Sequence, residues 1–406
     1  MSRPLHVVPA ENLRRALPSA LDGTGPALAV SSGKTVDSAA PTTTPNTAPT
    51  TVPNAVPDTV PDDVAVVVRT SGSTGDPRDV MLTSAALLAS ARASADRLGG
   101  TGTWLLTLPV AHVAGLQVLV RSHLAGTTPV ALPPGPFRAE GFTAAARRLA
   151  GPSYCSLVPT QLVRLLDDPE ATEALASFAA VLVGGAGAPD NLLARAAAAG
   201  VHVVTTYGAT ETCGGAVYDG RPLDGVETAL TDDGRITLTG PVLARGYLGR
   251  PDLDAQVLPL RAGRRWFVTS DLGRLTADGR LEVLGRADDV LVTGGTKVAP
   301  LAVERVIAGC PGVREALVVG VPDPHWGQAV TVLVVPTDDG PPTLAGLRAH
   351  VADRLGAAAA PRHLVLLDAL PLLGSGKPDR RSATALAARS SGTTDTTTEV
   401  NRGDSS

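Results

Sequence analysis

Short aliphatic runs alternate with longer, Ala-rich amphipathic stretches through the first half of the chain. The stretches at 84–98 and 189–199 have the length and spacing of helices. Strand-like runs separated by helix-length segments predict an α/β fold with crossover helices. The strand-like runs are 64–69, 104–108, 154–157, 181–183 and 201–205.

The pattern changes twice further along the chain. From 225 to 285, short strand-like segments are separated by Asp233-Gly234 and Asp278-Gly279, which are typical of tight hairpin turns. We therefore expect a β-rich subdomain there. Beyond Asp289 the pattern predicts a separate α+β unit. Its helix-like segments are 304–308 and 344–355, and its strand-like segments are 316–321, 329–335 and 363–367.

These changes predict a large N-terminal domain, 1–287, followed by a small C-terminal domain, 288–384. Segment 39–63 is rich in Pro and Thr and has too few core-forming residues to offset the entropy of ordering. We interpret it as a disordered linker or loop, with a proline-rich ligand for a partner as the alternative. Segment 385–406, rich in Ser, Thr and Asp, is expected to be a disordered tail.

Composition narrows the function classes. Of the 406 residues, 44% are hydrophobic and 18% charged, and the net charge of -4 gives no reason to expect nucleic acid or an anionic membrane as a partner. No run is long and apolar enough for a secretion signal or a membrane span. The widely spaced Cys155, Cys213 and Cys310 suit buried, inert thiols. We expect a cytoplasmic protein that acts on small molecules, and a homo-oligomer remains open.

A loop crowded with hydroxyls and glycines directly follows the first aliphatic run. Its sequence, TSGSTGDPR at 70–78, offers backbone N–H groups and hydroxyl donors to the oxygens of a polyphosphate. No Lys-Ser/Thr follows, so it is not the P-loop of ATPases, and a plain turn is the alternative. The candidate phosphate ligands are Thr70, Ser71, Gly72, Ser73, Thr74, Gly75 and Arg78.

Six further segments follow in a fixed order. They are LPVAHVAGL at 108–116, VGGA at 183–186, TYGATET at 206–212, TSDLG at 269–273, GRADDVLVTGG at 285–295 and GSGKPDR at 374–380. Together with the loop, they resemble the signatures of the adenylate-forming superfamily, which includes acyl-CoA synthetases, luciferases and peptide-synthetase adenylation domains. The resemblance implies that MgATP activates a carboxylate as its adenylate, and that coenzyme A then accepts the acyl group.

Two more segments resemble one branch of that superfamily. SLVPTQLVRLL at 156–166 and ETCGGAVYDGRPLDGV at 211–226 are similar to 2-succinylbenzoate-CoA ligases of menaquinone biosynthesis. The alternatives are an acyl-CoA synthetase for another acid, an enzyme that loads a carrier protein, and a catalytically silent binding module with the same fold.

Nucleotide contacts can be argued for several of these residues. Tyr207, just before Gly208, follows a buried strand and can stack on adenine, unless it is an ordinary core tyrosine. Gly184, Gly185 and Ala186 allow close backbone approach to the other face of the base. The resemblance assigns Thr210 to the α-phosphate.

Two carboxylates and one arginine complete the expected nucleotide site. Glu211 suits Mg²⁺, which takes one or two carboxylates together with phosphate oxygens. By resemblance, Asp271 accepts hydrogen bonds from the ribose hydroxyls, which a carboxylate does well. Arg286 is the matching ribose or phosphate contact, with a surface ion pair as the alternative.

The catalytic cation is expected to be Lys377, between Gly376 and Pro378. Adenylation builds charge on the α-phosphate and the attacking oxygen, and a positioned cation stabilises it. By resemblance, His112 is a gate between nucleotide and acyl group. Gln161 and Arg164 are candidates for the acyl pocket, where a second carboxylate needs a donor.

The resemblance also implies a moving C-terminal domain. Its hinge would be Asp288, and its rotation would bring Gly294 and Gly295 toward the path of coenzyme A. The sequence departs from the family pattern at three positions, which leaves their effect on activity open. Arg78 replaces a common lysine, Asp79 a glycine, and Ser270 a glycine.

Overall fold

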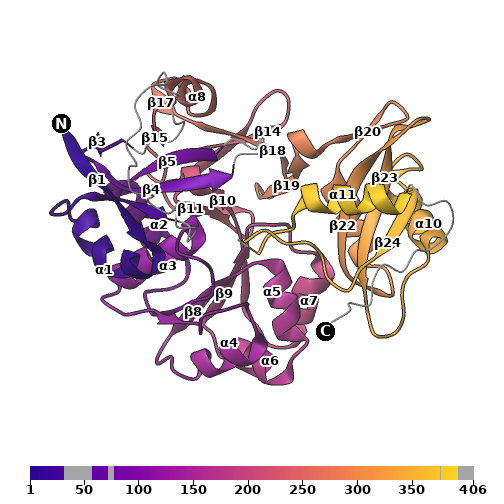
Figure 1. The fold of residues 1–406 in the computed structure, drawn as a ribbon, viewed down its shortest axis with the longest axis horizontal. Helices are drawn as coiled ribbons and strands as arrows, with labels where there is room; N and C mark the ends of the chain where they lie inside the picture. The colour runs from indigo at the N-terminus through magenta and orange to yellow at the C-terminus, as the bar shows by residue number, and fades with distance from the viewer. Residues whose placement is uncertain (32–56, 72–76, 375, 392–406) are drawn as a thin grey trace, which may run out of the picture.

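The computed structural model describes residues 1–31, 57–71, 77–374 and 376–391 (Figure 1). Two large sheets form the body of the N-terminal domain. The first has the order β15-β5-β4-β2-β1-β3, and the second has the order β12-β11-β10-β9-β8-β6-β7. The first consists of β1 (Ser2–Pro9), β2 (Ala27–Ser31), β3 (Thr59–Pro61), β4 (Val64–Ser71), β5 (Pro77–Thr83) and β15 (Gly246–Tyr247). The second consists of β6 (Thr103–Leu106), β7 (Val130–Ala131), β8 (Ser153–Leu157), β9 (Ala180–Gly184), β10 (Val203–Ala209), β11 (Gly214–Tyr218) and β12 (Arg221–Pro222).

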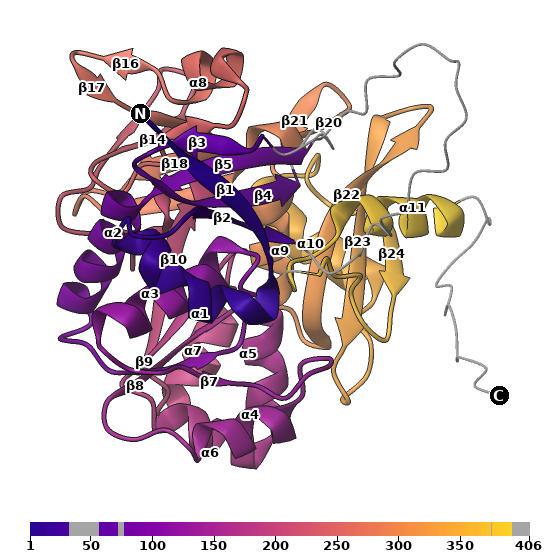
Figure 2. The ribbon, with the colours of Figure 1, turned by 60° about the vertical axis from the view of Figure 1, so that its left-hand side comes forward.

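Three helices fill the space between these sheets, and four cover the outer face of the second (Figure 2). The inner three are α1 (Ala10–Leu21), α2 (Ser84–Arg97) and α3 (Val113–Leu124). Leu17, Leu87 and Leu116 from these helices share one core with residues of both sheets. The outer four are α4 (Ala139–Ala146), α5 (Pro159–Leu166), α6 (Pro169–Ala176) and α7 (Asp190–Ala198).

The predicted β-rich subdomain is an antiparallel sheet in the order β13-β14-β18-β19. Its strands are β13 (Glu227–Leu230), β14 (Arg235–Thr239), β18 (Phe267–Leu275) and β19 (Leu281–Arg286). Gly234 and Gly279 adopt φ near +80° and +76° in the two predicted turns, where glycine is unstrained. A short ribbon of β16 (Leu260–Arg261) and β17 (Arg264–Arg265) and the helix α8 (Pro251–Val257) flank this sheet.

The small C-terminal domain is a five-stranded sheet with helices on both faces (Figure 1). Helices α9 (Pro300–Ala308) and α10 (Leu344–Leu355) share a core on one face, and α11 (Arg380–Ser391) packs on the other. The strands are β20 (Leu291–Thr293), β21 (Thr296–Val298), β22 (Val313–Asp323), β23 (Gly327–Pro336) and β24 (His363–Leu366). The prediction of an α/β domain followed by a small α+β domain is confirmed.

Both segments that we expected to be disordered contain regular structure at one end. Residues 59–61 form β3, which pairs with β1 and buries Val60 to 2% exposure. Residues 385–391 belong to α11, in which Ala387 is fully buried. β3 joins the edge of the first sheet beside β1, and α11 packs Ala383 and Ala387 on one face of the C-terminal sheet. A composition count does not register such contacts. The remaining parts, 39–56 and 392–406, lie outside the described residues. Within the described helices, none combines the length and the apolarity that crossing a bilayer demands.

Candidate active site

A cleft of about 1790 Å³ lies between the large and small domains, at the carboxyl ends of β9 and β10. Open α/β sheets bind ligands at this edge because helices and loops leave a crevice there. Twelve of the residues singled out in the sequence line this cleft. They are Thr70, His112, Gly184, Gly185, Ala186, Tyr207, Gly208, Thr210, Glu211, Asp271, Arg286 and Lys377.

The glycines after β9 leave no room for a side chain. A Cβ on Gly184 would lie 2.2 Å from Thr206 Oγ1 and 2.8 Å from the Thr206 carbonyl oxygen. Gly185 has φ near +81°, and its Cβ would lie 2.9 Å from Lys377 Cε. Close packing against Thr206 and Lys377 therefore requires glycine at both positions, and the approach of a ligand to this backbone stays a prediction.

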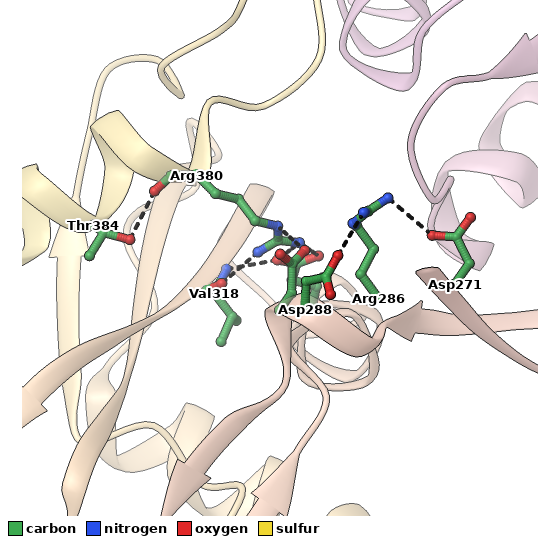
Figure 3. A network of polar contacts seen from close by, with 8 residues as sticks. Asp271, Arg286, Asp288, Val318, Arg380 and Thr384 are labelled. Atoms are coloured by element: carbon green, nitrogen blue, oxygen red, sulfur yellow. Dashed lines mark hydrogen bonds and ion pairs between the residues drawn. The ribbon is translucent and has the colours of Figure 1, made fainter. Parts of the chain in front are cut away.

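Tyr207 and Asp271 are joined by a hydrogen bond. The Tyr207 hydroxyl donates to Asp271 Oδ2 over 2.8 Å, while Arg286 Nη1 lies 3.4 Å from Asp271 Oδ1. Burial, reinforced by the Asp271 charge, raises the pKa of Tyr207, so its hydroxyl remains a neutral donor. Arg286 also contacts Asp288 Oδ2 over 3.1 Å, which ties this group to the next domain (Figure 3). Tyr207 is thus hydrogen bonded through its hydroxyl and also lines the cleft, and its stacking on adenine stays a prediction.

Glu211 lies in the short 3₁₀ helix η1 (Thr210–Thr212), where a buried tyrosine fixes its carboxylate. The Tyr247 hydroxyl, on a side chain 2% exposed, donates to Glu211 Oε1 over 2.7 Å. Burial and the nearby Glu211 raise the pKa of Tyr247, while Arg78 opposes that rise. In the described part of the chain, Glu211 Oε2 makes no hydrogen bond.

This carboxylate fits a Mg²⁺ ion that arrives with phosphate. Mg²⁺ typically takes one or two protein carboxylates and completes its shell with phosphate oxygens and water. No group of three or more His, Cys, Asp or Glu among the described residues could cage a metal alone. Glu211, with one oxygen held by Tyr247 and the other accepting no hydrogen bond, can supply the single protein ligand.

Lys377 reaches the cleft from the small domain. Its loop is held against the large domain by the Thr160 hydroxyl, which donates to the Gly376 carbonyl over 3.2 Å. Burial lowers the pKa of Lys377, and Arg286 adds to this effect, while Asp271 and Glu211 oppose it. The structure therefore places the predicted cation beside Gly185, within the electrostatic reach of both site carboxylates.

His112 precedes α3 at the other wall of the cleft. Burial, followed by the positive charge of Lys377, lowers the pKa of His112. The imidazole is therefore neutral at pH 7, which suits a side chain that closes off a pocket rather than one that adds positive charge.

Gln161 and Arg164 do not line the cleft, so the structure does not bring them together with the other predicted site residues. The Gln161 side chain accepts a hydrogen bond from Val158 N over 3.1 Å and donates to the Thr107 carbonyl over 3.3 Å. It caps α5, and Pro159 followed by a glutamine at the third helical position is the sequence signal for that role. Arg164 is exposed, and its charge lowers the pKa of Glu315 against the larger effect of burial.

The departures from the family pattern have structural partners. Asp79 lies opposite Arg69 in the β4–β5 pair, and the two side chains form a two-pronged ion pair with both distances 2.8 Å. Asp79 therefore links β4 and β5 through an ion pair, at a position where the family more often has glycine. Arg78 lies close to the Tyr247 hydroxyl and so to Glu211. The other loop candidates, Gly72 to Gly75, lie outside the described residues, and Ser71 ends β4.

The expected hinge and glycine loop lie apart from the cleft lining. Asp288 is in η2 (Ala287–Asp289), between the last strand of the large domain and the first of the small one. Gly294 and Gly295 form the turn between β20 and β21, with φ near +54° and +77°. A Cβ on Gly294 would meet the Trp326 ring at 2.8 Å.

Comparisons with known proteins match most of the chain to one family. Residues 7–248 match the family described as "AMP-binding enzyme", and residues 302–377 match "AMP-binding enzyme C-terminal domain". A "Probable 2-succinylbenzoate--CoA ligase" of Mycobacterium tuberculosis is 50% identical over 324 residues, which cover 78% of this chain and 83% of the relative. The 2-succinylbenzoate--CoA ligase of Geobacillus kaustophilus is 33% identical over 342 residues, covering 79% and 68%.

Solved structures of the same family also align with this chain. The o-succinylbenzoate CoA synthetase MenE of Bacillus subtilis, in complex with the acyl-adenylate intermediate OSB-AMP, aligns with a TM-score of 0.69 at 27% identity over 93% of this chain and 82% of that one. MenE in complex with ATP and magnesium ion has a TM-score of 0.67 at 30% identity, covering 81% and 71%. The resemblance drawn from the seven sequence segments is confirmed. The chain belongs to the adenylate-forming family of AMP-binding enzymes.

Proposed function

We propose that this chain is an ATP-dependent, AMP-forming ligase that converts 2-succinylbenzoate into its coenzyme A thioester. The observation that carries the proposal is the meeting of Lys377, from the small domain, with Glu211 and Asp271 in one cleft of the large domain. The relatives named as 2-succinylbenzoate ligases support the choice of acid.

Nucleotide binding follows from the residues in the cleft. Adenine lies between Tyr207 and the bare backbone of 184–186, and Asp271 accepts from the ribose hydroxyls in place of its present donors. Thr210 donates to the α-phosphate. When bound at Glu211, Mg²⁺ neutralises phosphate charge. Tyr247 holds the Glu211 carboxylate in place for it.

Lys377 acts in the first half-reaction. A carboxylate oxygen of the acid attacks the α-phosphorus, the bond to the bridging oxygen breaks, and pyrophosphate leaves with that electron pair. Negative charge accumulates on the α-phosphate oxygens and on the attacking oxygen, where a fixed cation in a water-poor cleft stabilises it. The neutral His112 closes the passage between the nucleotide and the acyl group.

The second half-reaction needs another arrangement of the same cleft. The sulfur of coenzyme A attacks the acyl carbon, its proton is lost to solvent, and AMP leaves. Lys377 occupies the space beside Gly185 in the structure and would have to leave it in the second step. We therefore infer that the small domain rotates, and we place the hinge at Asp288 on the domain boundary. This rotation withdraws Lys377 and brings the turn of Gly294 and Gly295 toward the thiol's path.

An ATP–pyrophosphate exchange assay tests the first half-reaction and the acid together. The panel holds 2-succinylbenzoate, benzoate, malonate and a medium-chain fatty acid, each with MgATP and without coenzyme A. We expect exchange with 2-succinylbenzoate at least about 100-fold faster than with the others, the discrimination typical of a site built for a polar group. Fast exchange with another acid would identify a different synthetase, and no exchange with any acid would favour the silent binding module.

A further inference from the structure

An arginine lies buried in the wall of the cleft, away from the nucleotide residues. Arg121, near the end of α3, is 6% exposed and lines the cleft together with Gln117, one helical turn earlier. Its guanidinium lies 4.8 Å from the centre of the Trp104 ring. Its Nη2 donates to Ser94 Oγ over 3.3 Å and to the Tyr218 hydroxyl over 3.2 Å.

This cation has no anionic partner within the described ranges of the chain. None of the ion pairs found there includes Arg121, and its buried Nε donates no hydrogen bond. A buried charge is ordinarily paired, because removing it from water costs several kcal/mol. Gln117 Oε1 is buried and unpartnered as well. Two unsatisfied polar side chains on one face of a helix indicate a polar ligand.

The neighbours of Arg121 do not depend on it. Ser94 Oγ and the Tyr218 hydroxyl are hydrogen bonded to each other over 2.9 Å, so both keep a partner when the guanidinium is removed. An arginine present only to satisfy buried hydroxyls would be superfluous here. Within the described residues, its charge meets the face of the Trp104 ring and no carboxylate.

Several neighbours of this guanidinium also line the cleft. Gln117, Gly214, Gly215 and Tyr218 belong to the same lining as Arg121. His112, whose pKa is lowered by burial and by the charge of Lys377, precedes α3, about 14 Å along the axis from Arg121 at 1.5 Å per residue. Both residues line the cleft.

We propose that Arg121 binds the carboxylate of the acid that is not activated. This inference rests on the proposed function, since 2-succinylbenzoate carries one carboxylate on its ring and one on its chain. Adenylation consumes one of them, and the other enters the cleft as an anion. The guanidinium can donate to it through Nη1, for which no hydrogen bond is found within the described residues, because Nη2 already donates to Ser94 and Tyr218. Arg121 takes the role that the sequence suggested for Arg164.

Arg121→Met is the variant that tests this role, because methionine keeps the length and apolar packing but removes the charge. The rate of adenylation is measured as pyrophosphate release. The acids are 2-succinylbenzoate and two monoacids that each lack one of its carboxylates, 4-oxo-4-phenylbutanoate and 2-butanoylbenzoate. The matched control is Arg164→Met, an exposed arginine outside the cleft. Melting temperature is measured for every variant.

For the diacid, we expect Arg121→Met to raise KM about 100-fold with kcat within a few-fold, the usual effect of losing a charge-assisted pair. Arg121→Lys should recover part of the loss. The monoacid that the wild type activates should be used equally well by Arg121→Met. Melting temperature should stay level or rise, because an unpaired buried charge is removed.

Three results would overturn the role of Arg121: equal losses on diacid and monoacid, a fall in kcat with unchanged KM, or a marked fall in melting temperature. If the wild type turns over neither monoacid, the split between KM and kcat on the diacid decides. Failure of the wild type to adenylate 2-succinylbenzoate would instead overturn the proposed function, so the two failures are distinguishable.

Discussion

At the scale of single residues, the positive charge of Lys377 in the cleft gives the first prediction. Lys377 lies beside Gly185 in the cleft, and it comes from the domain that we expect to move. Lys377→Ala should lower the rate of adenylate formation by about 100- to 1000-fold, the loss typical of removing one stabiliser of developing charge. Thioester formation from added acyl-adenylate should stay within a few-fold, because AMP is the leaving group there.

Arg354→Ala is the control for this variant, since Arg354 is an exposed cation on α10 of the same domain. Single-turnover measurements on each half-reaction give the two rates separately. Equal loss of both half-reactions in Lys377→Ala would contradict the assignment.

The pH dependence of adenylation follows from the same residue. Burial lowers the pKa of Lys377, and only its charged form stabilises the α-phosphate. The rate of adenylation should therefore fall as the pH rises. The fall should occur at a lower pH than it would if Lys377 had the pKa of an ordinary lysine. Lys377→Arg should be slower at neutral pH but hold its rate further into the alkaline range, since arginine stays charged. An alkaline fall at the same pH in both proteins would exclude Lys377 as its source.

Tyr247 is the residue through which the fold orients the proposed metal ligand. Tyr247→Phe removes the hydrogen bond to Glu211 Oε1 and leaves the ring buried. We expect the Mg²⁺ concentration for half-maximal pyrophosphate exchange to rise about 10-fold, as is usual when a group that orients a metal ligand is removed. Tyr154→Phe, a buried tyrosine with a weaker 3.4 Å hydrogen bond, is the control. An unchanged Mg²⁺ requirement would argue against this role.

Among the elements, β3 is the one whose stability contribution is most easily isolated. Val60 is 2% exposed in β3, whereas Val7 on the adjacent β1 is 56% exposed. Val60→Ala should cost about 2 kcal/mol, as the loss of buried methyl groups does, and Val7→Ala should cost almost nothing. The shift in the urea midpoint of the two variants measures this difference. Equal midpoints would mean that β3 contributes no stability, as a disordered segment would.

Elements with a strong local pattern could be predicted from the sequence. Of the parallel strands, β8 is buried throughout and β9 is an aliphatic run, and the turns at Gly234 and Gly279 contain the glycines that a positive φ favours. By contrast, β1 contains prolines and alternates only weakly, and it is held by pairing with β2 and β3. Long-range pairing of this kind leaves little local signal.

The candidate site was predictable in part for the same reason. Motifs place residues such as Glu211 and Lys377 on loops whose chemistry is local, but the direction of a helical side chain depends on what the helix packs against. Gln161 and Arg164 lie on the predicted helix, but Gln161 caps the start of that helix and Arg164 is exposed. Gln117 and Arg121 carried a usable signal, two polar residues four positions apart in an apolar helix with no acid nearby.

The whole molecule is held in one arrangement of its domains by several contacts. Arg305 donates to the Val283 carbonyl over 2.8 Å, and Leu301 packs where a Cβ on Gly187 would lie 2.8 Å away. Asn191 also donates to the Ala308 carbonyl. These contacts are few and polar at their edge, as expected between domains that separate in a reaction cycle.

Asp288→Pro tests the hinge. Proline fixes φ and removes a backbone donor, so one domain orientation should be trapped and the two half-reactions should change unequally, by about 10-fold or more. Asp288→Ala removes the same contact with Arg286 but leaves φ free, and it should affect both half-reactions little. Equal changes in Asp288→Pro, with the fold intact, would place the hinge elsewhere.

The most direct measurement for the whole account is mass spectrometry of the complete reaction with 2-succinylbenzoate, MgATP and coenzyme A. The account predicts a thioester with the mass of the acid plus coenzyme A minus water, formed in equal amount with AMP and pyrophosphate. Formation of ADP and phosphate, or of AMP without a thioester, would contradict it.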